Sequence, residues 1–274
     1  MPPALRLLSG PGCPVCVTPA SGIDRAIAAA RAPGVTLATF GDMMRVPGSS
    51  SSLEDERARG ADVRVVYSPL EALDAAREAP GREVVLIGVG FETTSPAIAA
   101  TVQRAERDGV RNFSVLPLFK RVPPALEMLA LVPGRPLDGF LCPGHVSVVI
   151  GSRAYDPVAR RRGIPCVVAG FEPVDILASV AMLLVQVRAV REGRAAAKVE
   201  TQYRRAVTPE GNARARAVLD EVFEVCDAEW RGIGVVPRSG YAFRGGFRSF
   251  DAAERLGLPE AAPADPGECA CGDI

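Results

Sequence analysis

Two cysteines in a short loop have the clearest chemical potential in this sequence. Cys13 and Cys16 are separated by two residues within the segment Gly10-Pro-Gly-Cys13-Pro-Val-Cys16. Thiols at this spacing can close a disulfide or bind one metal ion. The helix expected just after the loop would favour a negatively charged sulfur. The alternative is that both are small buried apolar residues, but prolines and glycines hold them in a tight loop that no helix or strand requires. We therefore take Cys13 and Cys16 as the candidate catalytic pair.

A second group of candidate ligands follows a later predicted strand, in Cys142-Pro-Gly-His145, which contains the only histidine. Its imidazole can bind a metal, carry a proton or act as a satisfied donor in the core. If two sheets face each other across a cleft, Cys13, Cys16, Cys142 and His145 could converge. Three sulfurs and one imidazole suit tetrahedral zinc. A zinc-stabilised α/β binding protein is therefore the alternative function.

Polar side chains also follow two other predicted strands. Glu92 is followed by Thr93, Thr94 and Ser95 where a strand gives way to a helix. A carboxylate and hydroxyls there can bind a ligand, although helix capping alone would explain the hydroxyls. Asp42 and Arg45 follow another strand. The alternative to a functional role is that these two side chains form an ordinary ion pair on the surface.

The elements that must position these residues alternate between apolar runs and amphipathic stretches. Nearly continuous Val, Ile and Leu is typical of parallel strands that are buried on both faces. Alternation of such strands with helices predicts a doubly wound sheet. The predicted strands are Leu5–Leu8, Val35–Thr39, Val63–Val66 and Val84–Ile87, and the predicted helices are Ser21–Ala32, Pro69–Ala79 and Ser95–Arg107.

The same pattern restarts in the middle of the chain. The strand that ends in Gly-Phe-Glu92 has an echo 80 residues later, at Gly-Phe-Glu172. We therefore predict an α/β fold with two similar doubly wound parallel-sheet domains, 1–111 and 112–200, facing a cleft. Ligands of such sheets bind outside the carboxyl ends of the strands. The second domain would contain strands Phe113–Leu118, Gly139–Cys142 and Cys166–Ala169 and helices Pro123–Leu131 and Val174–Arg188.

Residues 201–274 have a different character and form a third, partial region. A helix is predicted over Ala213–Trp230, followed by a glycine-rich irregular segment over Arg231–Phe250. The chain then stops at Cys269-Ala-Cys271-Gly-Asp-Ile274. Two sulfurs cannot hold an iron–sulfur cluster by themselves, because such a cluster usually needs four.

Composition excludes several classes of function. The 32 basic and 32 acidic side chains give no net charge, which weighs against nucleic acid or anionic lipid as a partner. The longest apolar run, Ile176–Val185, is shorter than the ~20 residues that cross a bilayer, so we expect no membrane association. Seven cysteines without an export signal predict a reducing compartment, the cytoplasm. Neither phosphate-binding glycine motif is present in convincing form.

Several motifs, taken together, point to one family. They are GPGCPVCVTP (10–19), TFGDMMRVPGS (39–49), GFETTSPA (90–97), PGHVSVVIG (143–151), GIPCVVAGFEP (163–173) and CACGDI (269–274). In this order, over nearly the whole chain, the set resembles the hydrogenase maturation family HypD. The resemblance implies two similar α/β domains and a third region that carries a [4Fe-4S] cluster.

The resemblance also implies a function and a set of partners. Members help to build the Fe(CN)2CO unit of [NiFe]-hydrogenase active sites, as scaffold and redox protein. They work with a HypC-type chaperone, which shares the iron cargo, and with a HypE-type cyanide donor. Neither nucleic acid nor membrane is expected as a partner.

Residue roles follow by position in the matching motifs. Cys13 and Cys16 match the redox-active pair of the interdomain cleft, where they would pass electrons or help to hold the iron. The residues expected to line the iron cleft are Asp42, Glu92, Thr93, Thr94 and His145. Cys271, with Cys269, is expected as part of the cluster's ligand set.

Two segments of the family pattern are not found in this sequence. The family normally begins with a Cys-Gly-Thr-His segment, and it continues past CGDI with further cysteines. We therefore expect a truncated member of the family, with an incomplete ligand set for the cluster.

Overall fold

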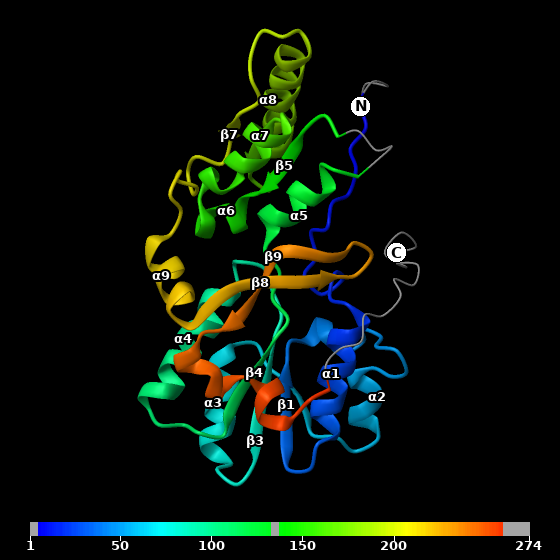
Figure 1. The fold of residues 1–274 in the computed structure, drawn as a ribbon, viewed down its shortest axis with the longest axis vertical. Coiled ribbons are helices and arrows are strands. Elements are labelled where there is room, and N and C mark those ends of the chain that lie inside the picture. Colours follow the sequence, from blue (N-terminus) through cyan, green and yellow to red (C-terminus); the bar gives the residue numbers. More distant parts are fainter. Residues whose placement is uncertain (1–4, 133–136, 260–274) are drawn as a thin grey trace.

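The computed structural model describes residues 5–132 and 137–259. It shows two α/β lobes stacked along the long axis, with a long antiparallel hairpin between them (Figure 1). The first lobe contains a four-stranded sheet and the second a three-stranded sheet. The predicted α/β class with parallel sheets is confirmed.

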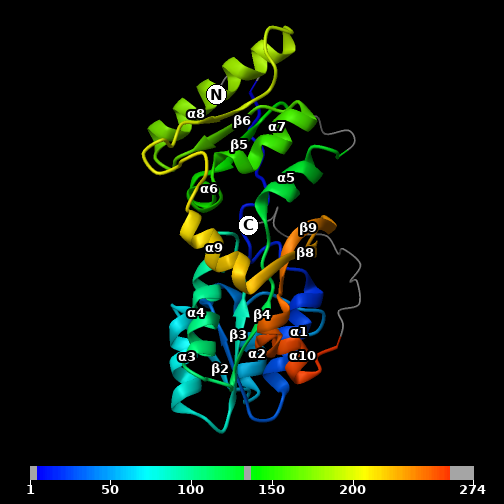
Figure 2. The same ribbon diagram turned by 60° about the vertical axis from the view of Figure 1, so that its left-hand side comes forward.

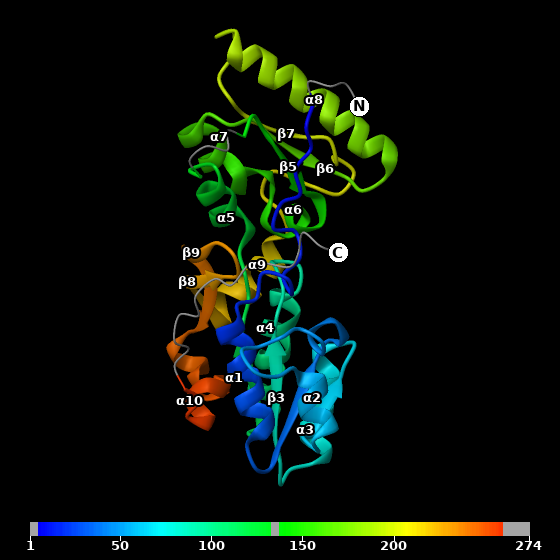
Figure 3. The ribbon, with the colours of Figure 1, turned by 90° about the vertical axis from the view of Figure 1, so that its right-hand side faces the viewer.

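The first lobe is a doubly wound sheet with strand order β2-β1-β3-β4, and all its pairs are parallel. Its strands are β1 (Val35–Thr39), β2 (Val63–Val65), β3 (Glu83–Gly88) and β4 (Phe113–Pro117). Every residue of β1 is buried, because helices cover both faces of the sheet. As Figure 3 shows, α1 (Ala20–Arg31) and α2 (Leu53–Ala58) lie with the sheet in this lobe, as do α3 (Pro69–Glu78) and α4 (Ser95–Arg107).

Two predictions for these strands are wrong. β4 pairs with β3 in the first sheet, so Phe113–Leu118 does not open the second unit, and a boundary at residue 112 would cut β4 from its sheet. No strand forms at Leu5–Leu8, where Leu7 and Leu8 are exposed. An apolar run shows that a strand is buried, but it does not show which sheet the strand joins.

The second lobe is smaller. Its parallel strands, in the order β5-β6-β7, are β5 (Phe140–Pro143), β6 (Cys166–Ala169) and β7 (Val199–Thr201). Its helices are α5 (Val122–Leu129), α6 (Gly144–Ile150), α7 (Asp156–Arg162) and α8 (Pro173–Arg191). Short 3-10 segments occupy Gly41–Met43, Ser152–Tyr155 and Gly245–Phe250.

The region after residue 200 is more regular than predicted. Helix α9 ends at Val222, and β8 (Phe223–Trp230) follows it directly, so the helix expected to reach Trp230 is too long. β9 (Gly234–Phe243) pairs with β8, so the segment expected to be irregular is largely strand. The rings of Phe223 and Phe243, which face each other across the hairpin, have centroids 4.7 Å apart. Such cross-strand aromatic pairs stabilise a hairpin. Helix α9 begins at Ala213, and α10 (Ala252–Leu256) packs back on the first lobe.

One hydrophobic cluster joins the lobes, and we call it the shared core. It combines Val17 and Phe91 from the first lobe, Val122 and Val146 from the second, and Trp230 from the hairpin, with neighbours from the same elements. Figure 2 shows the hairpin crossing between the lobes at this level. The shared core therefore fixes the N-terminal loop, the hairpin and both lobes relative to one another.

Helix α8 is unusual because its polar residues face inward. Asp175, Ser179 and Gln186 are buried, whereas Val174 and Leu177 are exposed. Within the described residues, α8 is the one helix long and apolar enough to cross a membrane. The uninterrupted apolar run Ile176–Val185 is shorter than this helix and does not predict such a length. A single helix that meets only these two criteria is weak support for a membrane span.

Candidate functional site: the dithiol loop beside the shared core

The two candidate thiols lie in contact. Cys16 Sγ donates to Cys13 Sγ over 2.6 Å, and the Cys16 backbone N–H donates to the same sulfur over 3.2 Å. Cys13 is half-buried and Cys16 is exposed. The sulfur separation lies between the ~2.05 Å of a disulfide and the roughly 3.8 Å expected for two sulfurs on one tetrahedral metal with ~2.3 Å bonds. Small movements of this loop would allow either chemistry.

Local hydrogen bonds hold the loop in its turn. The Thr18 hydroxyl donates to the Pro14 carbonyl over 2.8 Å, and the Val17 N–H donates to the Cys13 carbonyl over 3.2 Å. Pro19 then caps α1 in an extended conformation. The loop thus leads directly into α1, and both thiols precede the first turn of that helix in the chain.

Arg231, in the turn of the hairpin, ties this loop to two other segments. Its backbone N–H donates to the Val17 carbonyl over 2.9 Å. Its guanidinium donates to the Thr18 carbonyl over 2.9 Å and to the Pro47 carbonyl over 3.0 Å. Sequence reasoning missed this residue, because an arginine that binds distant carbonyls carries no local signal.

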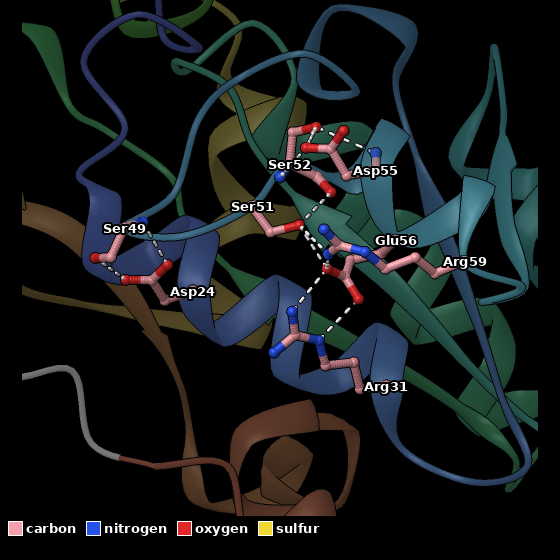
Figure 4. Close-up of polar contacts among 8 residues, drawn as sticks. All are labelled: Asp24, Arg31, Ser49, Ser51, Ser52, Asp55, Glu56 and Arg59. Carbon is pink, nitrogen blue, oxygen red and sulfur yellow. Dashed lines mark hydrogen bonds and ion pairs between the residues drawn. The ribbon is translucent and has the colours of Figure 1, made fainter.

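The segment around Pro47 is itself fixed to α1, as Figure 4 shows. The Ser49 N–H and hydroxyl donate to the two carboxylate oxygens of Asp24, over 2.7 and 2.5 Å. Gly48 lies so close to the Asp24 carboxylate that a Cβ would clash with it. The loop that follows β1 therefore has little freedom beside the dithiol loop.

A second polar cluster in Figure 4 holds the start of α2. Glu56 is buried and accepts hydrogen bonds from Arg31, Ser51 and Arg59. The Arg31 hydrogen bond, followed by that of Ser51, lowers the pKa of Glu56 to about 2. Ser52 and Asp55 complete a capping box.

Asp42 and Arg45 follow β1 but do not pair with each other. Both are exposed, and Arg45 Nε lies 3.4 Å from a carboxylate oxygen of Glu54. The alternative of an Asp42–Arg45 surface pair is wrong, because Arg45 points towards α2. Asp42 lies on the 3-10 segment Gly41–Met43.

Glu92 is the most deeply buried carboxyl among the predicted site residues. Its Oε1 accepts the N–H of Val122 over 3.0 Å, whereas its Oε2 has no hydrogen-bond partner in the described part of the chain. Burial raises the pKa of Glu92 to about 7. This carboxyl is therefore poised to exchange a proton near neutral pH.

Thr93 and Thr94, which follow Glu92, are less buried than this carboxyl. Thr93 is exposed and Thr94 is half-buried. Thr94 is the N-cap of α4, but its side chain makes no capping bond to any described residue, so the capping alternative is not what the structure shows. Gly90 has φ of +153° and lies against Thr94, which leaves no space for a Cβ.

His145 and its neighbours form a separate aromatic group at the carboxyl ends of β5 and β6. His145 is exposed, and its ring stacks on Phe171 with centroids 4.0 Å apart. Phe171 in turn meets Tyr203 edge-on at 6.2 Å. The guanidinium of Arg205 covers Tyr203 and pairs with Asp175, which holds the pKa of that carboxyl well below its usual range.

The structure contradicts the zinc site predicted from Cys13, Cys16, Cys142 and His145. Within residues 5–132 and 137–259, no group of three or more His, Cys, Asp or Glu side chains could hold a metal ion. Cys142 is buried beside Cys166, and burial raises the pKa of its thiol. Cys142 lies in the shared core and, within the described ranges, forms no such group with the dithiol.

The two terminal cysteines, Cys269 and Cys271, lie outside the described residues. The described residues do not themselves provide the ligands of a [4Fe-4S] cluster. The [4Fe-4S] cluster therefore stays a prediction.

Comparison with known proteins agrees with the motifs. The family model described as "HypD: Hydrogenase formation hypA family" matches residues 1–274. Hydrogenase maturation factor HypD of Rhodobacter capsulatus is 47% identical over 99% of this chain and 72% of its own length. The corresponding factors of Azotobacter vinelandii and Escherichia coli K12 are 46% and 44% identical, over 99% and 100% of this chain and 72% of their own lengths. The chain belongs to the HypD family of hydrogenase maturation factors.

Proposed function

We propose that this chain serves the assembly of the Fe(CN)2CO unit of [NiFe]-hydrogenases, with the Cys13–Cys16 dithiol as its reactive centre. The observation that carries the proposal is the 2.6 Å contact between two accessible thiols, in a loop anchored to the shared core. A dithiol placed where two lobes and a hairpin meet can respond to a partner that contacts either lobe.

Iron is the cargo in this proposal, and the dithiol would contribute two of its ligands. Each thiol loses a proton when its sulfur binds the iron, and soft thiolates suit this metal. The described residues offer no third His, Cys, Asp or Glu in a group with the pair. The remaining ligands must therefore come from elsewhere, which is the role we assign to a HypC-type chaperone.

The same pair can also supply electrons. When the two thiols close into a disulfide, they release two electrons and two protons, which a two-electron acceptor in the assembly complex would take up. A HypE-type protein as cyanide donor, and the cytoplasm as the place of action, are part of the same proposal. Both rest on the family resemblance.

Complementation of a host that lacks its own HypD-family factor tests this function. We expect Cys13→Ala and Cys16→Ala to abolish hydrogenase maturation while leaving the protein folded. The matched control is Cys226→Ala, which removes a half-buried cysteine of β8 and should retain activity. Full maturation by both alanine variants would overturn the role of the dithiol.

Metal analysis of the chain purified with its HypC-type partner gives an independent readout. We expect iron in the wild-type complex and a loss of that iron in both alanine variants. One tightly held zinc and no iron in the complex would contradict the proposal.

A further inference from the structure

A pocket separate from the dithiol lies where the second lobe meets the hairpin. It has a volume of about 590 Å³ and is lined by residues of α5 and α7, by Glu92 and Arg121, and by β9 from Val236 to Tyr241. Figure 1 shows α5 directly beside this hairpin. None of residues 10–19 lines the pocket. Its volume is within the range of ordinary small-molecule sites.

Two residues that line this pocket, Glu92 and Arg121, each have a buried polar atom without a partner among the described residues. Glu92 Oε2 and Arg121 Nε each have no hydrogen-bond partner in the described structure. Glu92 is only 1% exposed. An unsatisfied buried polar atom destabilises the folded protein, so such atoms call for a specific explanation. One is a carboxyl oxygen and the other an N–H donor, so a ligand with both an acceptor and a hydroxyl would satisfy both.

The rim of the pocket carries an excess of positive charge. Arg161, Arg162 and Arg238 line it together with Arg121. Arg162 lies 4.0 Å from Glu127, the other acidic residue of the lining. Arg121, Arg161 and Arg238 form no ion pair with any described residue. Several guanidinium groups around one cavity are typical of sites that bind phosphate or carboxylate groups.

Arg238 is held in a strained conformation at this rim. Its φ of +56° is the one positive value outside glycine among the described residues. Its N–H donates to the Asp227 carboxylate over 2.8 Å, and its carbonyl accepts from Arg121 over 2.6 Å. Backbone strain of this kind destabilises the folded protein and clusters at functional sites. Here it places two guanidinium groups on the same cavity.

The remaining wall is apolar and would contact the body of an organic ligand. It is formed by the side chains of Pro123, Pro124, Met128, Ile150, Val236 and Pro237. Tyr241 adds an aromatic ring, over which Arg121 lies at 5.6 Å from the centroid. A bare inorganic anion would leave this surface uncovered.

We propose that this pocket binds a small organic phosphate monoester. The phosphate oxygens would accept from the guanidinium groups of Arg121 and of the rim, and a protonated phosphate oxygen would donate to Glu92 Oε2. The carbon skeleton would cover the proline-rich wall. This site is distinct from the dithiol and does not depend on its function.

Calorimetric titration of the purified chain with phenyl phosphate tests the proposal. We expect saturable binding of one equivalent, about tenfold weaker in Arg121→Gln, because one charge-assisted contact is lost. The matched control, Arg107→Gln, removes an exposed arginine from the far end of α4 and should bind as tightly as wild type. Equal weakening in both variants, or no binding by the wild type at millimolar probe, would overturn the proposal.

A second variant separates binding from folding. Arg238→Gly removes a rim guanidinium but suits the positive φ, so it should keep or raise the unfolding temperature. We expect it to bind phenyl phosphate several-fold more weakly. Unchanged affinity in Arg238→Gly would contradict the assignment, and so would benzoate binding as tightly as phenyl phosphate, because that result would remove the preference for phosphate.

Discussion

Glu92 is a buried carboxyl that lines the proposed phosphate pocket and also affects the stability of the folded protein. It sits between Gly90, which has no space for a side chain, and α5, whose first N–H it accepts. The strand-to-helix position of Glu92 was readable from the sequence. Its burial was not, because burial comes from α5 and the hairpin, which are distant in the chain. The sequence also does not show the contacts of Arg121 and Arg231. Arg121 binds a carbonyl of the hairpin, and Arg231 binds carbonyls that are distant in the chain.

Glu92→Gln should change stability in a pH-dependent way. The folded pKa of about 7 exceeds the ordinary value of 4.5, so the folded state holds the proton more tightly between these values. Its contribution to the free energy of unfolding therefore falls as pH rises from about 4.5 to 7. Glutamine does not titrate, so the variant lacks this loss. The free energy of unfolding of the variant, relative to that of the wild type, should therefore rise by on the order of 3 kcal/mol from pH 4.5 to pH 8. Urea unfolding of both proteins at pH 4.5 and pH 8 measures this, and an equal difference at both pH values would contradict it.

At the scale of the element, the helices and most strands follow from periodicity, whereas their partners do not. The sequence predicts β1 and β3 to within one residue at each end, because a short apolar run between two helices is typical of a buried parallel strand. The assignment of β4 to the first sheet and the formation of β8 both depend on pairing with segments elsewhere in the chain. The hairpin matters most for function, since its turn supplies Arg231 to the dithiol loop.

Arg231→Leu should loosen the dithiol loop without unfolding either lobe. The variant keeps the backbone bond to Val17 but loses the guanidinium bonds to Thr18 and Pro47. Hydrogen bonds from a charged group contribute about 1.5–3 kcal/mol each, and partial exposure of Arg231 reduces this. Hydrogen exchange should become faster in residues 12–18 and 45–49 and stay unchanged in β1 and β3. The control is Arg248→Leu, an exposed arginine of the 3-10 segment Gly245–Phe250. Unchanged exchange in the loop would show that Arg231 does not position it.

At the scale of the whole molecule, the shared core decides whether the lobes act as one unit. It contains Trp230, the single tryptophan of the chain, whose indole N–H donates to the Ser239 hydroxyl over 2.8 Å. Phe91 stacks on this ring with centroids 6.2 Å apart. Two similar lobes could be expected from the Gly-Phe-Glu echo. The cluster that joins them could not, because its members come from segments spread over the chain.

Phe91→Ala should destabilise both lobes together. The lost packing in a shared core corresponds to about 3–5 kcal/mol for a buried phenylalanine. Because both lobes contact this cluster, far-UV circular dichroism and tryptophan fluorescence should shift to lower urea by the same amount. Separation of the two transitions, with only the fluorescence shifted, would show that the lobes unfold independently.

The most direct test of the account is to map which cysteines exchange with a glutathione redox buffer in the folded chain. Alkylation followed by mass spectrometry should find a two-electron couple in which Cys13 and Cys16 are linked to each other under oxidising conditions. Cys142 and Cys166, buried in the second lobe, should react only after unfolding. Oxidation that links Cys142 to Cys166 first, or leaves Cys13 and Cys16 as separate thiols, would contradict a working dithiol at this site.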